Sequence, residues 1–439
     1  MGEVALREES GVMAGKRLGI IGYGSRLRHM VAELERFGRD IRVVAVVDPA
    51  EQQLRESFPH LLEGVTFYAD AKTMLDEAGL DGVMIGTRCD LHTDLAIQVL
   101  ERSLPLYLEK PVSIDEEQLH RLYAASRQYE PKVVVGFPLR SSTLLQAVKE
   151  VIDSGVIGTV ENVQAINNVP FYGSNYYHGW MRDDSITGGL WLQKATHDFD
   201  YLTYLMGQLP ERIVAVESKT VFTGDMPAGL YCIDCPKYKT CPESQYNLFT
   251  LQGILDTLEN QEDWWAGRWQ CSFAVDTGNH DAATAILQYA SGAHLTYTQN
   301  FYARRTAAKR GAALIGYKGT VEFDWYRGDL TVHHHLSGRV ERHDYSGREI
   351  PHSGRRGGGS SGGGAHFGGD MELARDFLNL IYGEGESRAT LEDGLISAQL
   401  CLMAKRACET SQFQRFVPLG TQMRDTSSAG APVSVSPGR

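Results

Sequence analysis

The chain has 439 residues, enough for two or three domains with substantial hydrophobic cores. Acidic residues outnumber basic ones, 55 to 43, and the formal net charge of -12 argues against a nucleic-acid binder, which needs a basic face. No apolar run reaches the roughly 18 residues of a membrane-spanning helix, so we expect no membrane partner. Residues 1–15 carry charges where a secretory signal needs an apolar stretch, so we expect a disordered leader or an alternative start, and a cytoplasmic protein.

The first third of the chain alternates between short apolar runs and amphipathic stretches. Runs that we expect to be strands lie at 17–21, 41–49, 65–70, 81–87, 105–110 and 132–137. Helical patterns lie between them at 29–38, 50–58, 71–79, 92–103 and 115–128. Near-continuous Val and Ile runs that alternate with helices are typical of a parallel sheet covered on both faces. We therefore predict a doubly wound, Rossmann-type domain over residues 16–139.

A dinucleotide-binding turn follows the first predicted strand. Gly22 permits the tight turn, and Gly24 lets a pyrophosphate approach the backbone at the positive end of the next helix. Leu27 occupies the third glycine position of the usual motif, which weakens the signal. Asp48 ends the next strand, where a carboxylate binds both ribose hydroxyls and repels a 2′-phosphate, so NAD is favoured over NADP. The alternative is a strand–turn–helix unit that binds no ligand.

From residue 140 the pattern changes. We expect a helix at 141–155, a strand at 159–169 and a further helix covering about 189–206. Later runs, at 282–303, 312–325 and 329–336, alternate and contain glycine turns, which indicates a mostly antiparallel, open sheet. Two amphipathic helices are expected at 371–384 and 391–410. Residues 140–418 are thus predicted to form an α+β domain, with a flexible glycine-rich loop at 353–366 and a disordered tail at 419–439.

Three segments together resemble the Gfo/Idh/MocA family, the group of glucose–fructose oxidoreductase and inositol dehydrogenase. They are Glu-Lys-Pro at 109–111, GFPLRSS at 136–142 and GGLWLQKATHDFDYLTYLMG at 188–207. The resemblance runs from about residue 17 to about 415. It implies a Rossmann domain followed by an α/β domain whose open sheet serves substrate binding and oligomer contacts, as a homodimer or homotetramer. It also implies hydride transfer between a nicotinamide cofactor and a sugar or cyclitol.

The resemblance assigns two central catalytic residues. Lys110 matches the family's active-site lysine, which bonds the reacting hydroxyl, and the alternative is a surface ion pair with Glu109. His197 matches the catalytic histidine, since imidazole removes a hydroxyl proton near neutral pH. A helical histidine that only packs is the alternative there. Asp200, one helical turn on, orients His197 or simply caps and packs.

The sequence departs from the family pattern four residues before His197. Many relatives carry an acid there, whereas this chain has Gln193, which cannot transfer protons as a carboxylate does. Lys194 comes next, and we expect it either to bind substrate or to be a cation on the far side of the helix. Both residues are kept as catalytic candidates.

Further candidates contact the cofactor or the substrate. On the cofactor side we assign Gly22, Gly24, Ser25, Arg26, Asp48, Thr87, His92, Glu109 and Lys110. Arg26 is expected on the pyrophosphate, or on a 2′-phosphate if Asp48 turns away. On the substrate side we assign Arg140, Tyr177, Trp180, Arg182, Lys194 and Asp200, each of which could equally be a packing residue. The segment HFGGD at 366–370 resembles one near the family's cleft, although we expect little ligand role for His366.

An insert at about 224–275 is rich in cysteine. It contains Cys232, Cys235 and Cys241, and Cys271 follows thirty residues later. Clustered cysteines with Pro and Lys between them suggest a structural zinc site with these four ligands. The alternatives are free thiols in a reducing compartment or a disulfide.

Two enzymatic functions remain open at this point. The first is an NAD-dependent dehydrogenase acting on a hydroxyl carbon of a sugar, glycoside or cyclitol. The second is a redox glycosidase that oxidises, eliminates and reduces with recycled NAD. Net formation of NADH separates the two. A non-catalytic NAD-sensing protein is a third reading, favoured only by Gln193.

Overall fold

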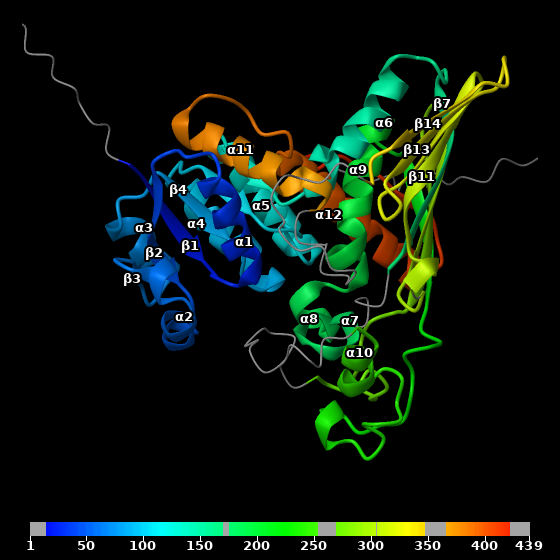
Figure 1. Ribbon diagram of the computed structural model, residues 1–439. Coiled ribbons are helices and arrows are strands. Elements are labelled where there is room, and N and C mark those ends of the chain that lie inside the picture. The colour runs from blue at the N-terminus through cyan, green and yellow to red at the C-terminus, as the bar shows by residue number, and fades with distance from the viewer. Residues whose placement is uncertain (1–14, 170–174, 253–268, 304, 347–365, 422–439) are drawn as a thin grey trace, which may run out of the picture.

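The computed structural model describes residues 15–169, 175–252, 269–303, 305–346 and 366–421, shown in colour in Figure 1. The predicted leader, glycine-rich loop and tail fall outside these ranges, apart from Gly15, His366 and residues 419–421. In the part that is described, no helix combines the length and the apolar character that crossing a bilayer requires.

The first domain is a parallel sheet in the order β3-β2-β1-β4-β5-β6. Its strands are β1 (Lys16–Ile21), β2 (Ile41–Val47), β3 (Thr66–Phe67), β4 (Gly82–Ile85), β5 (Leu106–Leu108) and β6 (Val133–Val135). Its helices are α1 (Ser25–Glu35), α2 (Glu51–Ser57), α3 (Ala71–Glu77), α4 (His92–Leu100) and α5 (Glu116–Gln128). The predicted Rossmann topology is confirmed, and the strand order reverses between β1 and β4, where ligands bind in such sheets.

The second domain is built on one sheet in the order β14-β13-β12-β11-β7-β10-β9-β8-β15. Only β7 and β10 pair in parallel; the other neighbours are antiparallel, as predicted. The strands are β7 (Val160–Asn168), β8 (Arg212–Ser218), β9 (Ala282–Gln288), β10 (His294–Asn300), β11 (Lys309–Gly316), β12 (Gly319–Asp324), β13 (Asp329–His334), β14 (Val340–Asp344) and β15 (Gln414–Arg415).

Helices cover the face of this sheet that is turned toward the first domain (Figure 1). The longer ones are α6 (Thr143–Asp153), which packs on β12 and β13, and α9 (Thr196–Met206), which packs on α12. Short helices α7 (Asn175–His178), α8 (Asp184–Thr187) and α10 (Gln245–Gln252) lie in the connections at the lower end of the sheet in that view.

The last two helices return the chain to the first domain. The first of them, α11 (Gly369–Tyr382), packs on α1, and α12 (Leu391–Thr410) contacts α5 and β6 as well as α9 and β8 (Figure 1). The amide of Val135 at the edge of the parallel sheet donates to the carbonyl of Ala389, at 2.8 Å. One continuous apolar core therefore spans both sheets.

The predicted helix at 189–206 starts with a wider turn. Residues Trp191–Ala195 form a π-helical turn, and α9 begins directly after it at Thr196. Such turns shift the side chains that follow relative to a regular helix and are frequent at functional sites. This one carries Gln193 and Lys194 and leads into His197.

Candidate active site

The turn after β1 has room for a dinucleotide. Gly22 has φ +83°, and a Cβ there would lie 2.9 Å from the backbone of Gly86 and Thr87, so only glycine suits this position. Gly24 precedes α1 with an ordinary φ of -68°, no side chain caps the helix there, and a Cβ would meet nothing within 4 Å. The space beside Gly24 at the start of α1 is therefore open, which fits a pyrophosphate at the helix N-terminus. Ser25 is the first helical residue.

Asp48 lies beside this turn, directly after β2. Its two carboxylate oxygens accept hydrogen bonds from the amides of Tyr23, at 2.7 Å, and Ala50, at 2.8 Å. Because each carboxylate oxygen has two acceptor sites, both oxygens retain capacity for ribose hydroxyls.

Arg26 lies in an ion network. Its Nε donates to Oε1 of Glu109 at 2.6 Å, and one Nη lies 2.8 Å from Oδ1 of Asp370 and 3.0 Å from the hydroxyl of Tyr107. Burial by itself would raise the pKa of Glu109, but Arg26 and Lys110 bring it below its usual value. The predicted pyrophosphate contact of Arg26 thus competes with two carboxylates that already hold its guanidinium.

Lys110 projects from the carboxyl end of the parallel sheet. It follows β5 and precedes a cis peptide bond to Pro111. Its Nζ donates a hydrogen bond to the main-chain carbonyl of Gln193 in the second domain, at 2.7 Å. Burial lowers the pKa of Lys110 below its usual range, although Cys89 and Glu109 oppose that shift. The lysine is therefore held at the junction of the domains rather than on the surface.

His197 faces the same junction from α9. It is buried, and its Nδ1 has no hydrogen-bond partner among the described residues. The centroid of its ring lies 6.0 Å from that of Phe137 and 6.1 Å from that of His366. Burial lowers the pKa of His197 well below its usual value, and four basic neighbours add to the shift: Lys110, Arg310, His366 and Lys194. The imidazole is therefore neutral near pH 7, with one of its ring nitrogens unprotonated.

Gln193 and Lys194 are both buried in the π turn. The side-chain carbonyl of Gln193 accepts a hydrogen bond from Sγ of Cys89 at 3.3 Å. The Nζ of Lys194 lies 5.9 Å from the centre of the Tyr176 ring. Burial, with Arg310 next, lowers the pKa of Lys194 well below its usual value. A solvent-facing position for Lys194 is therefore excluded.

Comparison with known proteins decides the family. Residues 16–137 match "Oxidoreductase family, NAD-binding Rossmann fold", and residues 145–322 match "GFO/IDH/MocA C-terminal domain". The chain belongs to the Gfo/Idh/MocA family of oxidoreductases. Its first domain is an NAD-binding Rossmann fold.

Individual Gfo/Idh/MocA relatives are distant. Putative oxidoreductase YteT of Bacillus subtilis (strain 168) is 26% identical over 329 residues, 70% of this chain and 76% of that protein. Myo-inositol 2-dehydrogenase of Thermotoga maritima is 26% identical over 200 residues, 45% of this chain and 57% of its own length. Among solved structures, levoglucosan dehydrogenase in complex with NADH and levoglucosan has a TM-score of 0.68 at 17% identity, over 91% of this chain and 99% of that one. An oxidoreductase domain protein from Kribbella flavida has a TM-score of 0.70 at 16% identity, over 92% of this chain and 100% of that one.

Two residues predicted to bind substrate in this Gfo/Idh/MocA protein form a buried ion pair. The guanidinium of Arg140 binds both oxygens of Asp200, with Nε to Oδ2 at 3.1 Å. A further Nη of Arg140 donates to the main-chain carbonyl of Arg388 at 2.9 Å. Both side chains are almost fully buried, and these contacts favour the packing alternative over the substrate alternative.

The other substrate candidates are also held by the protein. The hydroxyl of Tyr177 donates to the carbonyl of His280 at 2.6 Å within an apolar cluster. Arg182 donates to Asp276 at 2.6 Å. Trp180 is partly exposed and lies under the guanidinium of Arg88, at 4.1 Å.

Two cofactor candidates lie between the turn and Lys110. The Nδ1 of His92 is 2.8 Å from the carbonyl of Pro111, and its Nε2 is 3.3 Å from the carbonyl of Thr87. A neutral imidazole can donate only one of these hydrogen bonds, and either one holds His92 against the segments around the site. His92 is therefore buried beneath the site, whereas Thr87 is partly exposed beside it.

The zinc site expected at the four cysteines of the insert stays a prediction. Within the described ranges, no group of three or more His, Cys, Asp or Glu side chains is arranged to hold a metal ion. The four cysteines Cys232, Cys235, Cys241 and Cys271 are free thiols. Burial raises the pKa of Cys232 to about 11 and also raises those of Cys241 and Cys271. Part of the shift at Cys232 comes from Cys271, Cys241 and Cys235, so the four cysteines lie near one another.

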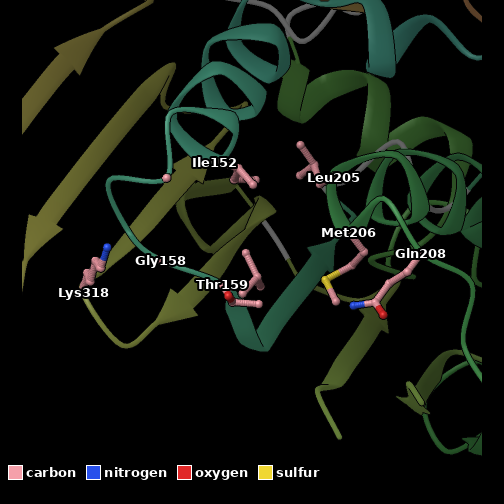
Figure 2. Close-up of a pocket in the computed structure, with 9 residues that line it drawn as sticks. Ile152, Gly158, Thr159, Leu205, Met206, Gln208 and Lys318 are labelled. Carbon is pink, nitrogen blue, oxygen red and sulfur yellow. The ribbon is translucent and has the colours of Figure 1, made fainter. Parts of the chain in front are cut away.

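A cavity of about 450 Å³ lies elsewhere, between the end of α6, the end of α9 and the turn at Lys318 (Figure 2). Ile152, Met206 and Thr159 line it, and none of the predicted site residues does. It is therefore separate from the Lys110–His197 junction.

Proposed function

We infer that this protein is an NAD-dependent dehydrogenase that transfers hydride between the nicotinamide and a hydroxyl-bearing carbon of a sugar, glycoside or cyclitol. The observation that carries this proposal is the meeting of Lys110 and His197 at the carboxyl end of the NAD-binding sheet. A partly buried ammonium and a neutral imidazole at one domain junction suit an alcohol that loses its proton as its hydride leaves.

NAD, when bound, supplies the hydride acceptor or donor. The open N-terminus of α1 beyond Gly24 would hold the pyrophosphate, and the carboxylate of Asp48 would accept bonds from the ribose hydroxyls. A carboxylate there repels a 2′-phosphate, so we expect NAD to bind more tightly than NADP.

The protein's own residues would act on the substrate hydroxyl. Lys110 spends one of its three donors on the carbonyl of Gln193 and has two left for the substrate oxygen. His197, kept neutral by burial and by its basic neighbours, accepts the hydroxyl proton. Gln193 and Lys194 lie at the same junction, in the π turn.

The substrate class rests on relatives. Proteins named inositol 2-dehydrogenase recur among the curated relatives, and levoglucosan dehydrogenase shares the fold. All of these names describe polyhydroxylated rings, which carry several secondary hydroxyls on which a lysine–histidine pair could act.

We also expect a homodimer or homotetramer that forms through the outer face of the nine-stranded sheet. Val216 and Ile286 project from the adjacent strands β8 and β9 and are 66% and 41% exposed. No described helix covers this face (Figure 1). Light scattering on the purified protein measures the subunit number.

The decisive experiment is a panel of sugars, glycosides and inositols incubated with NAD or NADP. Net accumulation of NADH, read by absorbance, is the expected result. Release of an aglycone without net NADH would assign the redox glycosidase instead. If neither product forms while NAD binds, as measured by calorimetry, the proposed function is wrong.

A further inference from the structure

The segment His366–Asp370 is held in a tightly specified turn beside the active site. Three successive residues, His366, Phe367 and Gly368, have φ values of +34°, +56° and +90°. Two of these are not glycine, and such conformations cost free energy unless the surroundings fix them. Phe367 stacks on Trp325 with ring centroids 6.2 Å apart.

Gly369 fixes the other end of this turn. A Cβ at that position would lie 1.8 Å from the carbonyl oxygen of Pro138, so the backbone of the turn is pressed against the segment after β6. Strained residues held in this way gather at functional sites. The consequence here is the position of one imidazole, that of His366.

Asp370 orients that imidazole. Its side chain is fully buried, and its Oδ2 lies 2.8 Å from Nδ1 of His366 and 3.2 Å from Nε2 of His29 on α1. Arg26 lies 2.8 Å from its other oxygen. Burial would raise the pKa of Asp370, but Arg26 and His366 bring it well below the usual value, so the carboxylate is ionised. An ionised acceptor places the proton of neutral His366 on Nδ1 and leaves Nε2 as the acceptor.

The rings of His366 and His197 lie close together, with their planes tilted by 38°. Their ring centroids are 6.1 Å apart, too far for a direct hydrogen bond and suited to a single bridging oxygen. The two differ in exposure: His197 is 8% exposed, whereas the side chain of His366 is 30% exposed. A proton taken up by His197 in the interior therefore has an acceptor next to it that reaches solvent.

We propose that His366, oriented by Asp370, carries the substrate's hydroxyl proton between His197 and solvent. This inference rests on the proposed dehydrogenase function. In the oxidation, the C–H bond breaks and its electron pair leaves as hydride to NAD. The O–H bond also breaks, its electron pair forms the second bond of the carbonyl group, and its proton passes to His197. The proton then passes through one bridging oxygen to Nε2 of His366 and on to water, while Asp370 balances the transient charge. The same path runs in reverse for reduction.

The His366–Asp370 pair would take the role of an acidic side chain that this chain lacks near His197. Gln193 occupies the position where an acid would form a proton relay with His197, and an amide cannot carry protons. His366 and Asp370 supply an ionisable pair from a different part of the chain. Arg26 connects this pair to the active site, because it binds both Asp370 and Glu109, the residue before Lys110.

The first test uses His366→Ala and His366→Gln with a substrate identified from the sugar panel. We expect kcat to fall about 100-fold and to recover when imidazole is added to the buffer, because free imidazole replaces a missing proton carrier. The glutamine variant preserves size if the alanine variant folds poorly. The matched control is His334→Ala, which removes the imidazole from another His–carboxylate pair, His334–Glu341 at 2.5 Å on β13 and β14. It should keep wild-type kcat and show no response to imidazole.

The outcomes separate the two proposals. A wild type that forms no NADH with any substrate overturns the dehydrogenase. An active wild type with unchanged kcat in both His366 variants overturns the relay alone. A loss of kcat that imidazole does not restore also overturns it, since that is the behaviour of a purely structural residue.

A second test needs no turnover. Nitrogen-15 NMR of the histidine rings in the substrate-free protein should show His366 with its proton on Nδ1, and Asp370→Asn should abolish that preference. A proton on Nε2 in the wild type would overturn the assignment of His366 as the acceptor next to His197.

Discussion

Lys110 and Gln193 belong to different domains, and the side chain of one is bonded to the backbone of the other at 2.7 Å. This bond fixes the ammonium at the end of β5 against the π turn that precedes His197. The acid–base machinery of the proposed reaction is therefore assembled from both domains at one contact.

Replacing Lys110 with Met tests the lysine directly. We expect kcat for NAD reduction to fall by about 10²–10⁴-fold, because the reacting oxygen loses its cationic donor. The Kd for NAD, measured by calorimetry, should remain near that of the wild type. Lys72→Met removes an exposed lysine of α3 and serves as the control. Retained turnover in Lys110→Met would contradict the assigned role.

Alanine substitutions at the two glycines of the nucleotide turn should distinguish an effect on folding from an effect on NAD binding. Gly24→Ala adds a methyl group in open space at an ordinary φ, so thermal stability should hold while NAD affinity falls, because the methyl lies where the pyrophosphate approaches. Gly22→Ala should lower both the thermal stability and the NAD affinity, since the left-handed conformation costs an alanine about 1–2 kcal/mol. Differential scanning fluorimetry and calorimetry measure the two effects. Unchanged NAD affinity in Gly24→Ala would remove the turn from the cofactor site.

The pH profile should reflect the depressed pKa of His197. Because burial and basic neighbours disfavour the imidazolium, the acid limb of kcat/KM should lie below the ordinary histidine value of about 6.5. Lys194→Met removes one of those positive neighbours, so the limb should move to higher pH. The unfolded chain binds this proton more readily than the folded protein, so its contribution makes the free energy of unfolding decrease as the pH falls below about 6.5. A limb above that value would contradict a neutral His197.

Breaking the Arg140–Asp200 pair should affect stability rather than recognition. Arg140→Met leaves Asp200 buried without its cation, which costs about 3–5 kcal/mol. Asp200→Asn should cost less, because Arg140 keeps its ion pair with Asp393 at 3.0 Å. Urea unfolding measures the loss, and the double variant should lose less than the sum of the two. A raised KM with unchanged stability would instead return both residues to the substrate site.

The parallel sheet was predictable because its strands are continuous Val and Ile runs between amphipathic helices. β14, by contrast, is almost entirely exposed, as is the outer half of β8, so neither carries the apolar signal on which a strand prediction depends. For the site, the resemblance singled out Lys110 and His197, and the structure places both at one junction, while their catalytic roles stay predictions. The resemblance could not show that Arg140 and Tyr177 are packing residues rather than substrate-binding residues, because both have suitable chemistry but point into the packed interior.

The His366–Asp370 pair illustrates what sequence reading missed. Asp370 meets His29 across 341 residues of chain, and no local periodicity reports such a contact. The run HFGGD, with two glycines before a helix, was the available signal. Its meaning depends on the backbone of Pro138 and on the ring of Trp325, whose positions only the folded chain provides.

The hydrogen bond between Val135 and Ala389 has a consequence for how the protein is made. The edge of the Rossmann sheet is completed by residues synthesised some 250 positions later, and α11 and α12 cover helices and strands of that first domain. Although N-terminal domains usually fold first during synthesis, this one reaches its final form only after the last helices have left the ribosome. A chain that is cut short before residue 369 would present the apolar flank of the first domain to chaperones and proteases, even with every NAD-contacting residue in place.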